Sequence, residues 1–257
     1  MSYRKRPSKT LKKLIPWLDV LAITAWGILL LRYWQSQQLY LLIHPNYFPL
    51  VVVAGFVLII IGIAKAMELM RQRGPVQEAQ HMNLIPPRLG SFLLIVVAII
   101  GFTIAPRVFA SDKAIQRGVA EFGQANSRLQ PQSFRSSTRP EDRSLVDWTR
   151  TLSVYPEPDA YTGQKVKVKG FVIHPPDSGR EYLFLARFVL TCCAADAYPV
   201  GLPVRLKQGQ TRDDFKKDDW FEVEGEMATE TFSGKRQLTI IASSMKKVSQ
   251  PKNPYSY

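Results

Sequence analysis

The sequence predicts a protein of two parts, a membrane-embedded α-helical N-terminal region with three transmembrane helices and an all-β C-terminal domain built as an OB-like, five-stranded barrel. Three observations lead to this fold class. All long apolar runs of the 257-residue chain lie before residue 107. Lysine and arginine are unevenly distributed around those runs. From residue 161 onward, apolar and polar residues alternate with the two-residue period of half-buried strands.

Three apolar segments, residues 14–34, 47–64 and 90–106, are candidates to cross a bilayer. A helix needs roughly 20 apolar residues to span a hydrocarbon core of about 30 Å, and the third segment is the shortest of the three. Core helices of soluble proteins carry a polar stripe, which these segments lack. A cleaved signal peptide does not fit the first segment, because its apolar stretch is too long and no small-residue cleavage site follows. We therefore predict a multi-pass protein of the cell (inner) membrane, in contact with the lipid bilayer.

Basic residues beside the spans predict the orientation, since lysine and arginine are retained on the cytoplasmic side. Residues 1–106 hold 11 basic and 3 acidic residues (net +8), which leaves 23 basic and 18 acidic residues (net +5) of the total +13. Ten of the 11 basic residues lie in the tail of residues 1–13 and in the connection after the second span: Arg4, Lys5, Arg6, Lys9, Lys12, Lys13, Lys65, Arg71, Arg73 and Arg88. The connection after the first span has only Arg32. The N-terminus is therefore predicted to be cytoplasmic, and three crossings of the transmembrane region 14–106 would make the C-terminal domain extracytoplasmic.

Residues 107–160 form a predicted helical and linker segment. A short helix over residues 111–124 precedes a polar stretch rich in proline and serine, which is typical of a linker. A second helix over residues 144–152 would pack through Leu145, Trp148 and Leu152.

The predicted β-domain covers residues 161–250. Its five strands are expected at residues 165–174, 182–191, 197–206, 219–227 and 236–245. Five short strands leave open edges unless the sheet closes, which favours a barrel over the alternative, a small open sandwich. Gly170 and Gly225 interrupt two alternating strands and would permit the coiling that closure needs. Lysines 165, 167 and 169 and glutamates 222, 224 and 226 would pair if their strands are neighbours.

Three segments of the sequence carry a family resemblance. IHPNYFPLVVVAG (43–55), YTGQKVKVKGFV (161–172) and RFVLTCCAADAYPVGLPV (187–204) resemble the YcgQ-like family of bacterial membrane proteins. The resemblance implies an OB-like C-terminal domain and a role as one subunit of a two-component permease, whose partner is a multi-span permease. It implies no catalytic residues.

The adjacent thiols of Cys192 and Cys193 are the most unusual local feature. On an extended strand they would point to opposite faces, whereas a bulge or turn would bring both sulfurs round to one ion, with Asp196 as an oxygen donor. Such a site would suit a soft metal ion, Zn(II) or Cu(I). Buried packing, metal or thiol binding, and redox chemistry all remain open for this pair. His174, expected opposite Tyr182 in the first hairpin, lies too far along the strand to be a ligand.

The sequence contains no Ser/His/Asp arrangement, glycine-rich phosphate loop or spaced metal motif, so no catalytic or cofactor-binding residues are predicted. The leading hypothesis is a non-enzymatic membrane subunit whose exported domain assists a permease in solute or ion transport. Gly55 and Gly62 would let the spans dock closely on the partner's helices. The alternative is a membrane-tethered metal- or thiol-handling protein that acts through the cysteine pair. Nucleic-acid binding through Arg180, Tyr182, Phe184 and Arg187 is disfavoured, because the domain would face away from the cell's nucleic acid.

Overall fold

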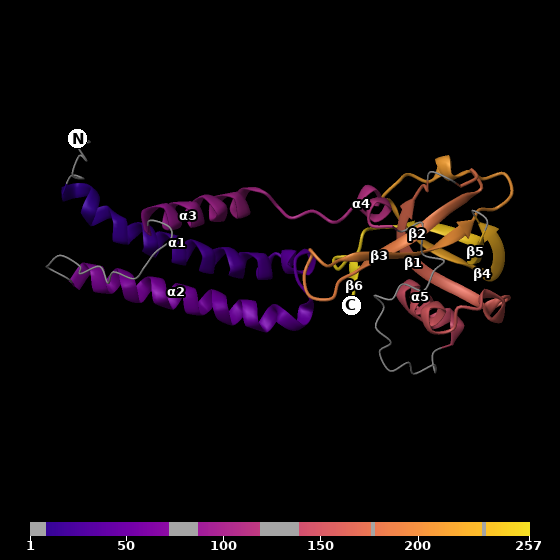
Figure 1. Ribbon diagram of the computed structural model, residues 1–257, viewed down its shortest axis with the longest axis horizontal. Helices are drawn as coiled ribbons and strands as arrows, with labels where there is room; N and C mark the ends of the chain where they lie inside the picture. Colours follow the sequence, from indigo (N-terminus) through magenta and orange to yellow (C-terminus); the bar gives the residue numbers. More distant parts are fainter. Residues whose placement is uncertain (1–8, 72–86, 119–138, 176–177, 233–234) are drawn as a thin grey trace, which may run out of the picture. The chain divides into compact units, whose positions relative to one another are not determined.

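The structure, a computed structural model, describes residues 9–71, 87–118, 139–175, 178–232 and 235–257 (Figure 1). The predictions for residues 1–8, for residues 72–86 of the connection after the second span, and for the polar linker up to residue 138 lie outside these residues. The chain divides into two compact units, Met1–Pro106 and Arg107–Tyr257. The first unit is helical and the second contains the whole β-sheet. Each unit is described by itself.

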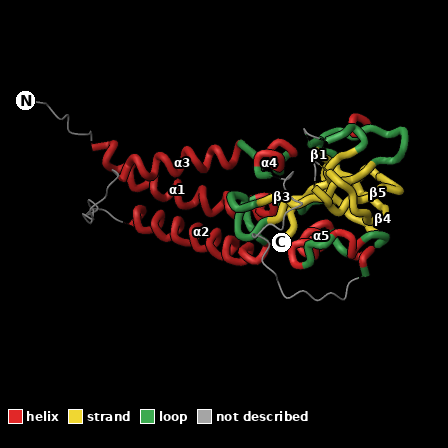
Figure 2. Tube along the Cα trace, turned by 45° about the vertical axis from the view of Figure 1, so that its right-hand side comes forward, coloured by secondary structure: helices red, strands yellow, loops and turns green. Residues whose placement is uncertain are grey.

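The helical unit contains three long helices, which lie side by side in Figure 2. Their bounds are α1 Lys9–Gln35, α2 Phe48–Arg71 and α3 Pro87–Thr103, and the short 3-10 turns η1 (Gln38–Leu41) and η2 (Pro45–Tyr47) connect the first two. Two segments are long and apolar enough to cross a membrane, Pro16–Gln35 and Pro45–Arg71. The prediction of three such spans is corrected here. With 17 residues, α3 is about 26 Å long, shorter than a hydrocarbon core of about 30 Å.

Small residues allow α1 and α2 to approach closely. A side chain added at Gly27 would meet Gly55 O at 2.9 Å, and one added at Gly55 would meet Leu31 Cδ2 at 2.9 Å. A Cβ at Gly62 would collide with the hydroxyl of Thr24. The residue order of these contacts makes α1 and α2 antiparallel. Gly55 and Gly62, which were predicted to face a partner's helices, are therefore occupied by contacts within this chain.

Side-chain hydrogen bonds join α1 to α3. Trp26 Nε1 donates to the carbonyl oxygen of Leu94 (3.0 Å), and Ser91 Oγ donates to Asp19. Near the end of α3, Tyr33 donates its hydroxyl hydrogen to Gly101 O (2.7 Å) and Arg32 donates to Phe102 O (3.0 Å). The last carbonyls of a helix have no partner within the helix, so Tyr33 and Arg32 supply the missing donors. The contacts advance in the same direction along both helices, which makes α1 and α3 parallel.

The second unit is built on one six-stranded sheet. Its strands are β1 Lys165–Ile173, β2 Tyr182–Val189, β3 Tyr198–Arg205, β4 Trp220–Phe232, β5 Lys235–Val248 and β6 Tyr255–Ser256. The sheet order β1-β4-β5-β3-β2-β6 and the additional pairing of β1 with β2 join the first five strands into a ring. The ring agrees with the predicted closure rather than with an open sandwich. Beyond it, β6 adds a parallel pairing to the end of β2, which the sequence did not predict.

The two glycines predicted to permit closure do so by letting backbone approach backbone. A Cβ on Gly170 would lie 2.6 Å from the carbonyl oxygen of Ala186 on β2. A Cβ on Gly225 would collide with the carbonyl oxygen of Ile241 on β5. The pairing of β4 with β5 shifts register between Glu224 and Gly225, and such a bulge bends and twists a strand.

The two charged ladders pair, because β1 and β4 are neighbours in the sheet, which was the condition of the prediction. In the antiparallel β1–β4 ladder, the register sets Lys165 opposite Glu226, Lys167 opposite Glu224 and Lys169 opposite Glu222. Lys167 Nζ lies 2.7 Å from Glu224 Oε1, and Lys169 Nζ lies 3.0 Å from Glu222 Oε2. Cross-strand pairs of opposite charge favour this register over a slip by one residue, which would bring lysines opposite the apolar side chains of β4.

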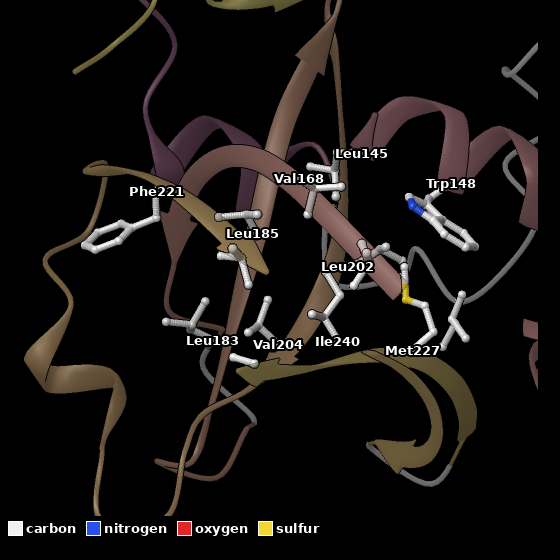
Figure 3. Close-up of a cluster of buried hydrophobic side chains, with 14 of the residues drawn as sticks. Leu145, Trp148, Val168, Leu183, Leu185, Leu202, Val204, Phe221, Met227 and Ile240 are labelled. Carbon is white, nitrogen blue, oxygen red and sulfur yellow. The ribbon is translucent and has the colours of Figure 1, made fainter. Parts of the chain in front are cut away.

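Helix α5 (Leu145–Val154) packs against the β-sheet and contributes side chains to the core of the ring. Ser144 caps it through a reciprocal capping box with Asp147. Leu145 and Trp148 are buried in the same cluster as Val168, Leu185, Leu202, Val204, Met227 and Ile240, whose side chains point toward one another in Figure 3. Leu152 packs against this cluster, so all three predicted contact residues of the helix are confirmed.

Candidate functional site: the Cys192–Asp196 turn

The predicted strand does not reach the cysteines. β2 ends at Val189, and the chain then makes a turn in which the backbone N–H of Asp196 donates to Cys193 O (3.0 Å). The Cys192 side chain is exposed and that of Cys193 is half-buried. Both thiols are free. Of the two geometries considered from the sequence, a strand with its thiols on opposite faces or a turn, the structure has the turn.

Asp196 closes this turn. Its Oδ2 accepts the backbone N–H of Cys192 at 2.7 Å, and its Oδ1 accepts that of Thr191 at 3.2 Å. The three predicted site residues are therefore brought together. Asp196, however, already accepts backbone hydrogen bonds at both of its oxygens.

The carboxylate strongly perturbs the neighbouring thiol. The hydrogen bond to Asp196, followed by that to Cys193, raises the pKa of Cys192 to about 11 from its ordinary value of 9.0. Burial by itself raises the pKa of Asp196, but the hydrogen bonds from Cys192 and from neighbouring backbone N–H groups outweigh it, so that this pKa is lowered. At neutral pH, Asp196 is ionised and the Cys192 sulfur is a protonated thiol. Because the thiolate is the nucleophile, Cys192 should be unreactive at neutral pH despite its exposure.

We expect alkylation of Cys192 to rise about tenfold per pH unit between pH 7 and 10, and to level off only near pH 11. Iodoacetamide labelling of the Cys193→Ser variant, read by peptide mass spectrometry, measures this rate. Asp196→Asn removes the negative charge but keeps an oxygen acceptor, so its labelling at pH 8 should be on the order of tenfold faster. Equal rates in the two proteins would show that the carboxylate does not control the thiol.

Among the described residues, no group of three or more His, Cys, Asp or Glu side chains is arranged to hold a metal ion. His174 Nε2 is engaged by Phe215 O at 2.7 Å, in agreement with its exclusion as a ligand. The hairpin register sets Ile173 opposite Phe184, one residue away from the predicted pairing. The soft-metal site at Cys192, Cys193 and Asp196 stays a prediction.

The residues considered for nucleic-acid stacking are not an open platform. Phe184 is buried, and the hydroxyl of Tyr182 donates to Glu230 Oε2 (3.0 Å). Arg187 donates to Asn253 O (3.2 Å), and its guanidinium lies 5.6 Å from the centre of the Trp220 ring. Arg187, which would have to contact a nucleotide, is therefore bound by the C-terminal segment of the same chain.

An aromatic cluster covers part of the outer surface of the ring. Phe188 stacks on Phe171 with ring centroids 5.7 Å apart, and Phe109 and Tyr255 contact Phe188 from the two ends of the unit's sequence. Tyr255 is 1% exposed. These contacts were missed from the sequence because residues 109 and 255 lie outside the predicted β-domain. The sequence around Phe109 and Tyr255 has no helix or strand periodicity that would indicate which side chains they pack against.

The two units define a class of protein, in which an apolar helical region with two candidate membrane spans is joined to an all-β domain that contains a ring of five strands. This chain belongs to the DUF1980 family. Residues 18–120 match the DUF1980 N-terminal domain and residues 133–257 match the DUF1980 C-terminal domain. The chain is also similar to UPF0703 protein YcgQ of Bacillus subtilis (strain 168), with 25% identity over 107 residues. That match covers 41% of this chain and 36% of the relative, and it confirms the YcgQ-like resemblance.

Proposed function

We propose that this protein is a non-enzymatic membrane subunit that holds an extracytoplasmic, OB-like domain beside a partner permease and assists it in solute or ion transport. The observation that carries the proposal is the apolar exterior of the helical unit. Leu50, Ile60 and Met70 on α2 are 68%, 64% and 66% exposed, and Phe92 and Leu93 on α3 are each 59% exposed. A large exposed apolar surface is unfavourable in water, so lipid or the helices of a partner would cover it.

The parallel arrangement of α1 and α3 supports the proposed sidedness. If α1 crosses the bilayer, its two ends lie on opposite sides. The hydrogen bonds of Tyr33 and Arg32 hold the end of α3 at the level of the end of α1. The chain would then leave α3 on the side opposite to the N-terminal tail, even though α3 is short. The basic residues of that tail favour the cytoplasm for the N-terminus.

A reporter fused after Tyr257 tests the sidedness. Alkaline phosphatase, which is active only outside the cytoplasm, should be active in this fusion, and green fluorescent protein should be dark when exported through the general secretory route. A matched pair of fusions after Arg71, at the end of α2, should give the opposite result. A fluorescent, phosphatase-negative fusion at Tyr257 would refute the extracytoplasmic assignment of the β-domain.

A pull-down tests the partnership. The full-length protein, solubilised in mild detergent from a host that encodes a permease of the kind found with YcgQ-like proteins, should recover a multi-span membrane protein. Substituting Ile60→Asn on the exposed face of α2 should reduce that recovery if the partner's helices cover this face. Ser36→Asn, at an exposed position after α1, is the matched control and should not. Recovery of no multi-span protein would contradict the permease role.

The thiol turn supports a second candidate function, a membrane-tethered metal- or thiol-handling protein. The observation in its favour is the exposed position of Cys192, in a turn whose backbone N–H groups donate to the carboxylate of Asp196. On this hypothesis, the reduced full-length protein retains about one equivalent of Zn(II) or Cu(I) after gel filtration and loses it in the Cys193→Ser variant. A wild-type protein that holds no more metal than the variant would exclude the metal-binding form of this function.

A further inference from the structure

We infer that residues 107–117, which join α3 to the β-domain, form a detachable strap, and that docking of this strap holds the turn at Asp218 in a strained conformation. The strap and its contacts lie within the second unit, so this inference is independent of the proposed transport function. Three features support it: the contacts that hold the strap, the shortness of its helix and the left-handed backbone of Asp218.

The first half of the strap is held at two points. The ring of Phe109 packs against that of Phe188 on β2, with centroids 5.3 Å apart. The backbone N–H of Ser111 donates to Asp218 Oδ1 at 2.5 Å, in the turn that precedes β4. Ser111 is 2% exposed, so water has little access to this hydrogen bond. The first half of the strap therefore contacts both a strand and a turn of the β-domain.

Arg117 holds the other end of the strap. Its guanidinium donates to the carbonyl oxygen of Ala197, which directly precedes β3, and lies 5.0 Å from the centre of the Phe109 ring. Arg117 is exposed, and cation–π contacts at exposed sites are weak. This end can therefore leave the domain more readily than the first half.

The helix inside the strap depends on docking. α4 (Ser111–Gln116) has six residues, whereas isolated helices shorter than about 12–15 residues are marginal in water. Of these six residues, Ser111 and Ala114 are buried, so docking covers little apolar surface. Figure 1 shows α4 beside the strands of the β-domain. We therefore expect two states, a docked helix and an undocked, open chain.

Asp218 links the strap to the sheet. Its φ of 68° lies in the left-handed region, which is unfavourable for residues with a side chain, although aspartate tolerates it better than most. In this conformation the carboxylate accepts the N–H of Ser111, while the backbone N–H of Asp218 donates to Val172 O on β1 at 3.0 Å. Docking therefore compensates the backbone strain. When the strap undocks, the turn can relax and release the hydrogen bond to Val172.

The connection from α3 to the strap is short. α3 ends at Thr103, and four residue steps lead to Arg107, where the strap begins. A fully extended chain covers at most about 3.6 Å per residue, so this connection reaches no more than about 14 Å. A displacement of α3 that exceeds this reach must pull on the strap. We expect the strap to undock before the sheet opens, because few contacts hold it.

Hydrogen–deuterium exchange of the full-length protein in detergent, read by mass spectrometry, tests the inference. Ser111→Pro deletes the N–H that Asp218 accepts, and proline is well tolerated at the first position of a helix. Exchange should rise about tenfold or more in two places, the amides of the strap and the amide of Asp218. Asp112→Asn, at the next and exposed position, is the matched control and should leave both unchanged. Peptides from β4 and β5 report whether the domain stays folded.

Unchanged exchange in the strap of Ser111→Pro would overturn the detachable strap, and faster exchange in the strap alone would overturn its coupling to the turn. Phe109→Ala removes a different strap contact and should give the same paired rise, so it takes the place of Ser111→Pro if that variant does not fold.

Asp218→Gly separates the two effects, because glycine adopts the left-handed backbone without strain. This variant loses the acceptor for the Ser111 N–H, so the strap should exchange faster. The amide of residue 218 should stay as slow as in the wild type. A fast amide at residue 218 would show that backbone strain does not couple the strap to the turn.

Discussion

Replacing Gly225 by valine is expected to unfold the β-domain or to destabilise it by at least about 3 kcal/mol, the upper part of the range for overpacked sites. The Cβ atom would collide with the carbonyl oxygen of Ile241, which belongs to the backbone of the neighbouring strand and cannot rotate away. Relief requires that β4 and β5 separate at the register shift beside Gly225. Pulse proteolysis of the full-length protein across a urea series measures the loss as a lower midpoint.

The matched control for this substitution is Gly179→Ala. A Cβ at Gly179 would also meet close atoms, but they are the carboxylate of Glu181, the far end of a flexible side chain that can move aside. We expect the control to change the midpoint little. A Gly225→Val protein as resistant to protease as the control would show that the ring does not need close backbone approach at this position.

Trp148→Ala is expected to cost about 3–5 kcal/mol, the usual range for truncating a fully buried tryptophan. Trp148 is 0% exposed, at the point where α5 packs into the ring, and its ring lies 6.1 Å from that of Tyr161 in an edge-on contact. Trp148→Phe should cost much less. The indole Nε1 is buried without a hydrogen-bond partner among the described residues, so phenylalanine sacrifices no hydrogen bond.

The control for the tryptophan series lies at the end of the same helix. Tyr155 is 62% exposed, and Tyr155→Ala should change stability by no more than about 0.5 kcal/mol. The same protease assay serves all three variants. If Trp148→Ala destabilised the protein no more than Tyr155→Ala, α5 would not be part of the core of the β-domain.

The ring itself was predictable because its determinants are local. Alternation of lysine with valine in residues 165–169, and of glutamate with apolar residues in residues 221–227, specifies which side chains face water. Where two such strands are neighbours, cross-strand pairs of opposite charge favour setting the two ladders opposite each other. The start of α5 is also determined locally, although the prediction did not use this signal, since serine followed three residues later by an acidic side chain satisfies the first free N–H groups of a helix.

The site was predictable only as a pair of alternatives. Residue type indicated that two thiols and Asp196 could act together, but not whether the backbone would turn to bring them together. That outcome depends on where β2 stops pairing with β3, which is at Val189 opposite Tyr198. The structure selected the turn, and it also engaged Asp196 with backbone donors, which no spacing rule indicates.

Length and tertiary contact decided the helical unit in different ways. Apolar composition identified all three helices from the sequence. The third has the predicted length of 17 residues, but it begins three residues earlier and ends at Thr103, ahead of Pro106, because the residue before a proline disfavours helical geometry. Gly55 and Gly62, which were expected to contact a partner's helices, contact α1 instead. A glycine in a helix indicates that another segment approaches closely, but it does not indicate which segment.

The sequence by itself determined the two-part organisation, the β-strands and the amphipathic helix before them. Each follows from a periodicity that acts over a few neighbouring residues. The pairing of the charged ladders depended on β1 and β4 being neighbours, which the sheet order decided. Only the tertiary structure decided the closing contacts at Gly170 and Gly225, the packing of Phe109 and Tyr255 on the ring, and the conformation at Cys192. These depend on backbone atoms and side chains that are distant in sequence, and their positions relative to one another follow from packing the whole domain at once.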